Sequence, residues 1–209
     1  MKFYDCAFAP SPKRVRMFLA EKGVTPEVVE IDIRSGAQFA PKFRAVNPFC
    51  TVPVLELDDG TRLITTDGCR TWLEEAYPEP PLLGRTASER GQVADALHLI
   101  MFHGMQAVSD ALRNSMPQMA DRGVVGPDNY AQIPDLAKRG KARAAKFMGT
   151  LDAMIGAKPF VCGDVFTAAD IDAFICVAFA KWAEIEPGDA HPNVRRWYEA
   201  VGKRKSASV

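Results

Sequence analysis

The amino-acid sequence predicts an α/β domain at residues 1–80, followed by an all-α domain at residues 86–209. Short β-rich runs alternate with helical patterns in the first part of the chain, which is typical of an α/β unit. The segment Pro78-Glu79-Pro80-Pro81 then interrupts every regular element and indicates a linker. Beyond it no convincing strand pattern occurs and the apolar residues follow helical periodicity, so the remainder is predicted to be helical.

In the α/β part, the expected order is strand, helix, strand, short helix, β-hairpin and helix. A strand–helix–strand start predicts a parallel pair of strands joined by a right-handed crossover. Asp59-Gly60, between two β-rich runs, is a strong signal for a hairpin turn. The expected strands cover residues 2–7, 27–33, 52–57 and 62–64, and the expected helices cover residues 12–22, 38–46 and 66–77.

The part after the linker is predicted to hold helices at residues 87–114, 135–155, 167–184 and 193–201. The segment between the first two of these helices contains Gly and Pro and is expected to be irregular. Thr167 and Asp170 have the spacing of a capping box that starts a helix, so we assign them to stability and not to catalysis.

Composition excludes several classes of function. The 26 basic and 26 acidic residues balance, which argues against nucleic acid or an anionic membrane surface as the main partner. No apolar run reaches the roughly 18 residues of a membrane span, and the N-terminal charge cluster follows its apolar run, the reverse of a secretory signal. The five cysteines are scattered without a CxxC pair, which predicts a reducing, cytoplasmic location and no metal site.

Four strings carry a resemblance to a known family. They are SPKRVRMFLAEKGV at residues 11–24, NPFCTVPVLELDDGT at 47–61, LEEAYPEPPLLG at 73–84 and GDVFTAADI at 163–171. In this order and spacing they resemble the cytosolic glutathione transferases, especially the bacterial and fungal members whose first helix begins with a Pro-x-Pro segment. The resemblance implies a thioredoxin-like N-terminal domain, a C-terminal helical bundle, glutathione as co-substrate without a metal, and a homodimer.

The resemblance places the glutathione site in the first domain. It implies a cis peptide bond at Val52-Pro53. The main chain of Val52 would pair with the cysteinyl part of glutathione in the manner of an added strand. The alternative is a proline that only starts an edge strand. Gln38 and Thr51 would contribute polar contacts, Gln38 at the glycyl end of glutathione, whereas the alternative for each is a solvated loop residue.

Thr65 and Thr66 stand where the family has Glu-Ser for the γ-glutamyl group. The helix start at this point can hold a carboxylate on its unpaired N–H groups. With Thr65 in the acidic place, the counter-charge for the glutathione amine has to come from Asp67 or from another chain. One of the two threonines can instead serve as the helix N-cap, and both roles are compatible.

The thiol-activating Ser or Cys of many family members falls on Ala9, which cannot donate a hydrogen bond. Ser11 directly precedes Pro12 and is predicted to be the N-cap of the first helix, with catalysis as the alternative. Tyr4 on the first strand could also donate, although a core or sheet-face role is favoured. The dipole and open N–H groups of the helix start would lower the pKa of a thiol, with Tyr4 or a water as hydrogen-bond donor.

Four further side chains carry expectations from the resemblance. Met101 and Met105 on the long helix would line an adaptable apolar pocket for the electrophile, and ordinary helix core is the alternative. Phe49 would insert into the partner subunit of a dimer, and a buried core phenylalanine is equally consistent. Cys50 replaces a usual glycine and would be a small spacer or a site of mixed disulfide with glutathione.

The leading functional hypothesis is a glutathione transferase that conjugates the glutathione thiolate to hydrophobic electrophiles. A glutathione-dependent peroxidase or dehalogenase acting at the same site is the second enzymatic hypothesis. A non-catalytic glutathione- or ligand-binding protein of the same fold is the third, and Ala9 and Thr65 favour it.

Overall fold

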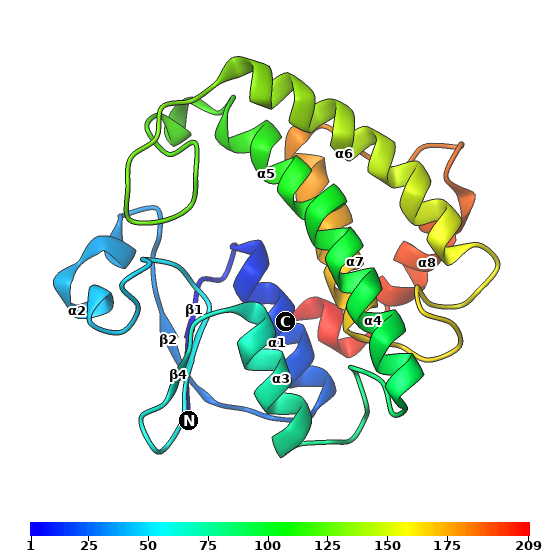
Figure 1. The fold of residues 1–209 in the computed structure, drawn as a ribbon, viewed down its shortest axis with the longest axis horizontal. Helices are drawn as coiled ribbons and strands as arrows, with labels where there is room; N and C mark the ends of the chain where they lie inside the picture. Colours follow the sequence, from blue (N-terminus) through cyan, green and yellow to red (C-terminus); the bar gives the residue numbers. More distant parts are fainter. The chain divides into compact units, whose positions relative to one another are not determined.

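The computed structural model describes residues 1–209 and divides them into two compact units. Unit 1 comprises Met1–Pro80 together with Val125–Asp128 and Val209, and unit 2 comprises Pro81–Val124 and Asn129–Ser208. All four strands belong to unit 1 and unit 2 is helical (Figure 1), so the predicted fold class is confirmed.

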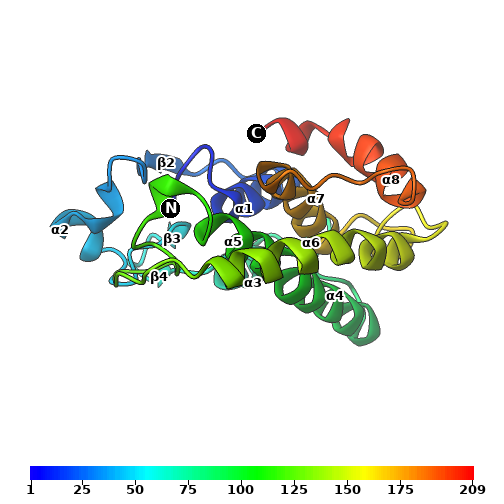
Figure 2. The ribbon, with the colours of Figure 1, turned by 90° about the horizontal axis from the view of Figure 1, so that it is seen from above.

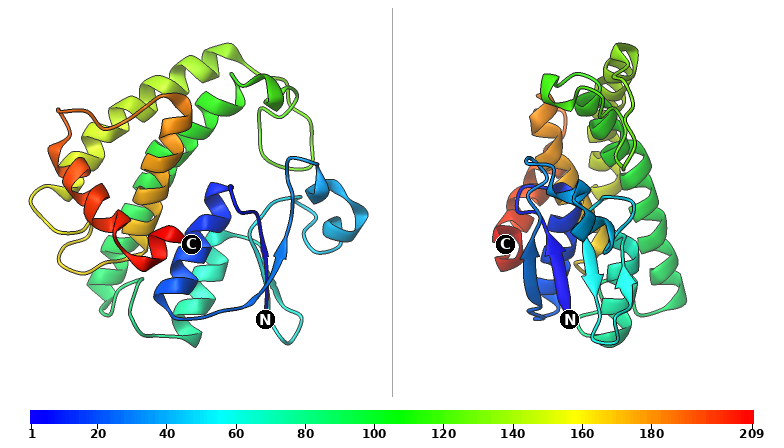
Figure 3. Two further views of the ribbon diagram at one scale, coloured as in Figure 1. Left: turned by 180° about the vertical axis from the view of Figure 1, so that it is seen from behind. Right: turned by 90° about the vertical axis from the view of Figure 1, so that its left-hand side faces the viewer.

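Unit 1 is built on a four-stranded sheet with the strand order β2-β1-β3-β4 (Figure 3, right). β1 (Lys2–Asp5) lies parallel to β2 (Glu27–Glu30), as the predicted crossover requires. β3 (Val54–Glu56) is antiparallel to β1 and forms the predicted hairpin with β4 (Arg62–Leu63). Phe3 of β1 lies opposite Leu55 of β3 and both side chains are buried, so the strand register follows the apolar pattern.

Two helices of unit 1, α1 (Pro10–Glu21) and α3 (Thr66–Ala76), lie side by side (Figure 1). The 3₁₀-helix η1 (Ala37–Phe39) and the short helix α2 (Pro41–Arg44) follow β2. A second apolar cluster is centred on three buried side chains, Ile31, Phe43 and Val54. This cluster joins the sheet to α2, whereas the predicted hydroxyl residues Ser11 and Thr66 lie in the first turns of the paired helices α1 and α3.

The start of α1 differs from the prediction. The helix begins at Pro10, and Ala9, with extended backbone angles, is the N-cap and makes no side-chain capping bond. Ser11 is thus the second residue of the helix, and the prediction that Ser11 is the N-cap is wrong. Both Pro10 and Pro12 fit within the first turn because N–H groups at those positions have no partner inside a helix.

Unit 2 contains one long helix where a single α-helix over residues 87–114 was expected. It is composed of α4 (Ala87–Leu99), a π-helical segment η2 (Ile100–Met105) and α5 (Gln106–Arg113). A Cβ atom at Gly104 would lie 2.6 Å from a ring carbon of Phe147 and 2.7 Å from the sulfur of Cys176. The glycine therefore permits the π-helical segment to pack closely against the helices that carry Phe147 and Cys176.

The other helices of unit 2 are α6 (Pro134–Ile155), α7 (Ala168–Ala180) and α8 (Pro192–Gly202), with 3₁₀ turns η3 (Pro117–Met119), η4 (Lys181–Ala183) and η5 (Lys205–Ser208). In unit 2, α6 lies beside α5 (Figure 2), α7 packs against α4 and the π-helical segment, and α8 packs against α6 and α7. No helix combines the length and apolarity needed to cross a membrane.

Carboxylates hold the starts of two helices in unit 2. Thr167 and Asp170 form the predicted capping box of α7, and the main-chain N–H of Thr167 donates to Asp170 at 3.0 Å. Asp152 on α6 accepts the N–H groups of Asn193 and Val194 at 2.8 and 3.0 Å, so it caps α8 from another helix. Both contacts satisfy donors that a helix leaves unpaired at its first turn.

Candidate functional site

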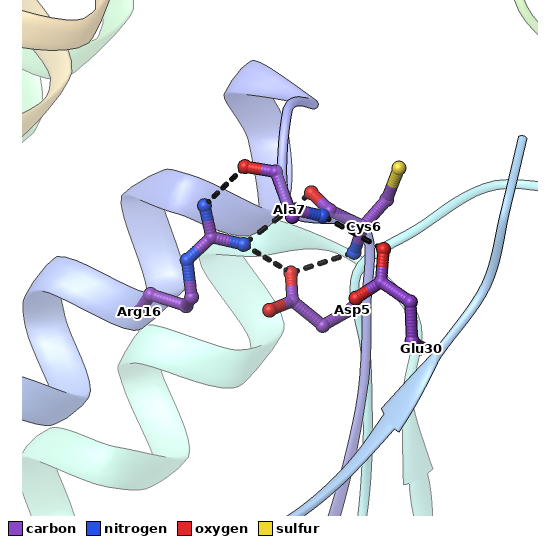
Figure 4. Close-up of polar contacts among 5 residues, drawn as sticks. All are labelled: Asp5, Cys6, Ala7, Arg16 and Glu30. Atoms are coloured by element: carbon purple, nitrogen blue, oxygen red, sulfur yellow. Dashed lines mark hydrogen bonds and ion pairs between the residues drawn. The ribbon is translucent and has the colours of Figure 1, made fainter.

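The loop between β1 and α1 is held by side chains that bind its main chain (Figure 4). Arg16 donates to the carbonyl oxygens of Cys6 and Ala7 at 3.3 and 2.8 Å, and it pairs with the Asp5 carboxylate at 2.6 Å. The N–H of Ala7 donates to Glu30 at 3.0 Å. These bonds tie the loop to α1 and to β2, so the chain enters Ala9 and the first turn of α1 along a defined path.

The first turn of α1 offers a single open main-chain donor. Pro10 and Pro12 have no N–H, and the N–H of Lys13 donates to the carbonyl of Ala9 at 3.2 Å. The N–H of Ser11 makes no hydrogen bond within the protein. The expected set of open N–H groups at this helix start is therefore reduced to one, accompanied by the Ser11 hydroxyl.

The first turn of α3 offers two open donors. The Thr65 hydroxyl accepts the N–H of Gly68 at 3.0 Å, so Thr65 is the N-cap, one of the two roles expected there. The N–H groups of Thr66 and Asp67 have no acceptor in the protein. Asp67 forms an ion pair with Arg70, which limits its use as the counter-charge for a ligand amine. This helix start is suited to binding a carboxylate.

A buried arginine connects the two helix starts. One nitrogen of Arg14, Nη2, lies 3.2 Å from the Ser11 hydroxyl and 3.3 Å from the Thr66 hydroxyl. The Arg14 residue is only 3% exposed. The two hydroxyl oxygens are consequently no farther apart than these two distances combined, so one compact site contains both.

The Val52-Pro53 peptide bond is cis, as expected from the sequence. The main-chain N–H and C=O of Val52 make no hydrogen bond within the protein, although Val54, two residues later, pairs with β1. An unpaired main-chain donor and acceptor on one partly exposed residue is what an added peptide strand requires.

Gln38 and Thr51 have different environments. The side-chain oxygen of Gln38 on η1 is buried and has no hydrogen-bond partner. A buried acceptor without a donor is costly, so it favours a ligand that supplies one. The hydroxyl and carbonyl oxygens of Thr51 both accept from the side-chain amide of Asn47, at 3.0 and 2.8 Å, which gives Thr51 a part in holding its loop.

Comparisons with known proteins agree with this geometry. Residues 8–76 match the family model "Glutathione S-transferase, N-terminal domain", and residues 134–200 match the "Glutathione S-transferase, C-terminal domain" model. The chain is 30% identical over 209 residues to "Glutathione S-transferase 2" of Saccharomyces cerevisiae, covering 99% of this chain and 87% of the yeast protein.

The chain belongs to the glutathione S-transferase family. Solved structures of the family support the assignment along the whole length. A glutathione S-transferase domain-containing protein of Marinobacter aquaeolei matches with a TM-score of 0.90 at 32% identity, covering 99% of both chains. A class Gtt2 glutathione S-transferase of Vibrio parahaemolyticus matches with a TM-score of 0.83 at 31% identity, covering 99% of this chain and 95% of that one.

Tyr4 contacts residues other than those at the two helix starts. Its ring packs edge-on against Phe43, with centroids 6.0 Å apart, and its hydroxyl donates to Glu56 at 3.5 Å. Burial, and then the Glu56 carboxylate, raise the pKa of Tyr4. Tyr4 also packs against the apolar cluster of Ile31, Phe43 and Val54.

Phe49 and Cys50 are adjacent but differ in exposure. Phe49 is 59% exposed, which removes the alternative of a buried core phenylalanine. Cys50 is buried, its thiol faces the carbonyl of Pro48 at 3.6 Å, and its φ of 53° lies in the region that favours glycine. The burial supports the spacer role of Cys50.

The two methionines expected to line the electrophile pocket differ in exposure. Met101 is 37% exposed on the π-helical segment, beside the exposed ring of Phe102, whereas Met105 is buried in the core of unit 2. The carbonyl of Phe102 accepts a hydrogen bond from Arg143 at 2.7 Å, which satisfies one main-chain group of the π-helical segment.

Two arginines of α1, Arg14 and Arg16, were not recognised from the sequence. Arg14 follows Ser11 by three residues, a spacing that places both side chains on one helix face and could have indicated their contact. The contact of Arg14 with Thr66 spans 52 positions, and no local pattern reports it.

Proposed function

We propose that the protein is a cytoplasmic glutathione transferase that conjugates the glutathione thiolate to hydrophobic electrophiles. The observation that carries the proposal is the unpaired main chain of Val52, next to a cis proline, in the same unit as two open helix starts. A peptide with a carboxylate at one end and a thiol in the middle complements these three features. The yeast relative is named a glutathione S-transferase, which supports the same conclusion.

Glutathione would bind along unit 1 as an extended peptide. The N–H and C=O of Val52 would pair with its cysteinyl residue. The γ-glutamyl carboxylate would accept the open N–H groups of Thr66 and Asp67, where the helix dipole favours negative charge. The buried side-chain oxygen of Gln38 would accept a donor from the glycyl end.

The thiol would lie at the start of α1. The Ser11 N–H and hydroxyl are the donors this turn offers, because Ala9 has no polar group and both prolines lack an N–H. Donors and the helix dipole stabilise the thiolate and lower the pKa of the thiol, which raises the reactive fraction at neutral pH. The thiol proton passes to solvent, the sulfur forms a bond to the electrophilic carbon, and the leaving group departs with its electron pair.

The test combines binding and turnover. The protein should be retained on immobilised glutathione and eluted by free glutathione, and it should convert an aryl halide with release of halide. Ser11→Ala should lower the turnover number more than it lowers retention, whereas Ser35→Ala, on an exposed loop, is the matched control that should change neither. Retention without turnover of aryl halides, peroxides or haloalkanes would instead establish a binding protein.

We also propose that the protein is a homodimer in which Phe49 contacts the partner. A large aromatic side chain with this exposure is typical of an interface anchor. Light scattering should give about twice the chain mass of 22.9 kDa. Phe49→Ser should shift the protein toward the mass of one chain, and an unchanged dimer in this variant would remove Phe49 from the interface.

A further inference from the structure

Arg14 donates two hydrogen bonds from the same nitrogen atom. The Nη2 group carries two N–H bonds, and its acceptors are the hydroxyl oxygens of Ser11 at 3.2 Å and Thr66 at 3.3 Å. The side chain lies between the first turn of α1 and the first turn of α3, and it is buried. The two helix starts therefore share one cationic donor.

This arrangement determines the direction in which each hydroxyl can donate. A guanidinium has donors and no acceptor, so Ser11 and Thr66 must both act as acceptors toward Arg14. The proton of each hydroxyl is then free to be donated elsewhere. Neither hydroxyl donates to any acceptor within the protein. Two O–H donors of fixed polarity thus remain for a ligand.

We propose that Arg14 is a positioning residue that directs the protons of the Ser11 and Thr66 hydroxyls toward two anionic groups of bound glutathione, the thiolate and the γ-glutamyl carboxylate. The proposal rests on the proposed glutathione-binding function and adds to it a residue that does not itself contact the ligand. Arg14 is the side chain whose hydrogen bonds reach both hydroxyls.

The physical benefit is preorganisation. A hydroxyl that is free to rotate has to be reoriented when an anion binds, whereas one that already accepts from a cation presents its proton in advance. Hydrogen bonds that chain from a cation through a hydroxyl to an anion also polarise one another. Arg14 would in this way stabilise the thiolate through Ser11 and the carboxylate through Thr66, compensating in part for the methyl group at Ala9.

The test separates the two hydroxyls by choice of ligand. The ultraviolet absorbance of the bound thiolate, titrated against pH, reports on Ser11, and the dissociation constant of S-methylglutathione, which has no thiol, reports on the carboxylate pocket. The variants are Arg14→Met, Arg14→Lys, Ser11→Ala, Thr66→Val and the double variant Ser11→Ala with Arg14→Met. Arg44→Met, which removes an exposed arginine of the same unit, is the control.

Arg14→Met should raise the thiol pKa by about one unit, which means about tenfold less thiolate at a given pH below it. It should also weaken S-methylglutathione binding by about tenfold. Ser11→Ala should reproduce only the first effect and Thr66→Val only the second. Adding Arg14→Met to Ser11→Ala should not shift the thiol pKa further. Arg14→Lys keeps a cation with several N–H donors but has a shorter side chain without the planar guanidinium, so it should restore neither property fully.

Several results would overturn the proposal. An unchanged thiol pKa in folded Arg14→Met, or effects of Arg14→Met and Ser11→Ala on that pKa that simply add, would show that Arg14 does not act through Ser11. If Arg14→Met does not fold, Ser11→Ala and Thr66→Val still decide, because both keep the arginine, and failure of either to give its assigned effect refutes the assignment. If the wild type binds neither glutathione nor S-methylglutathione, the proposed function itself is wrong, an outcome distinct from unaffected variants of a binding-competent wild type.

Discussion

The ammonium group of Lys22 lies 2.7 Å from the carboxylate of Glu74, and its side chain has no exposed surface. The same nitrogen donates to the carbonyl oxygen of Pro80 at 2.6 Å. Lys22 follows the last residue of α1, Glu74 belongs to the last turn of α3, and Pro80 lies in the segment after α3. One buried cation therefore ties together three segments at the end of unit 1.

Replacing Lys22 by methionine should destabilise unit 1. The substitution removes the ion-pair partner of Glu74 and the donor to the Pro80 carbonyl at one buried point, which costs about 3 kcal/mol of unfolding free energy. Urea unfolding followed by circular dichroism measures the change. Lys203→Met, which breaks the solvent-exposed pair with Glu199, is the control and should leave the unfolding curve nearly unchanged. Equal effects of the two variants would contradict the assignment.

Asp170 should contribute a pH-dependent part of the stability of unit 2. It accepts hydrogen bonds from the N–H groups of Val161 and Thr167 and from the indole of Trp197, all at 2.9–3.0 Å. Burial raises the pKa of Asp170 despite these donors. Because the folded-state pKa lies above the unfolded value, this contribution is complete below about pH 3.9 and is lost as the pH rises through the folded pKa.

Asp170→Asn should therefore remove that pH dependence. The difference in unfolding free energy between wild type and Asp170→Asn should move against the wild type as the pH rises from about 4. Asp170→Ala should be less stable than Asp170→Asn by about 3 kcal/mol at every pH, since neither variant titrates at this position and alanine leaves the buried donors unpaired. Unfolding in urea at a series of pH values provides the measurement, and parallel stability curves for wild type and Asp170→Asn would refute the prediction.

At position 50, glycine should give a more stable protein than alanine, although alanine is the more stabilising of the two at most positions. The φ of 53° at Cys50 is unfavourable for any side chain, at a cost of about 1–2 kcal/mol that glycine does not incur. Both Cys50→Gly and Cys50→Ala remove the buried thiol, so their comparison isolates the backbone effect. We expect Cys50→Gly to be more stable than Cys50→Ala by about 1 kcal/mol in thermal or urea unfolding. The opposite order would show that the loop adopts another backbone conformation.

Cys69 should be chemically inert in the folded protein. Burial raises the pKa of its thiol to about 12, so very little thiolate exists at pH 8. Alkylation by iodoacetamide at pH 8, followed by mass spectrometry of peptides, should leave Cys69 unmodified in the native protein. The same treatment in urea should label all five cysteines. Rapid labelling of native Cys69 would indicate local opening of α3.

The element order of unit 1 could be predicted because each signal is local. Asp59-Gly60 specifies a hairpin turn by its own conformational preferences, and the parallel strand pair follows from the strand–helix–strand order. α1 begins two residues before the predicted start, because Ala9 caps the helix without a polar side chain and the sequence therefore carries no capping signal there. The π-helical segment contains Gly104, which packs closely against Phe147 and Cys176, and such a long-range contact is not visible in the periodicity of the sequence.

The candidate site was predictable only in part, because some of its contacts join residues that are far apart in the sequence. Val52, Thr65 and Thr66 stand in recognisable motifs. In the structure the main chain of Val52 is unpaired, Thr65 is the N-cap of α3 and the Thr66 hydroxyl accepts from Arg14. Whether a hydroxyl can donate its proton to a ligand, however, depends on which group in the protein already donates a hydrogen bond to it. Arg14 lies in an apolar helix pattern as one more charged residue, and its acceptors become apparent only when α1 and α3 are placed side by side.

The frame around the loop that leads to Ala9 binds only main-chain oxygens and nitrogens of that loop, through Arg16 and Glu30 (Figure 4). Such a frame is insensitive to which side chains the loop carries. Substitutions at the exposed Ala7 can therefore alter the surroundings of the helix start while the path of the backbone stays the same. A scaffold of this kind allows reactivity to diversify by single replacements, without a new loop conformation having to be selected each time.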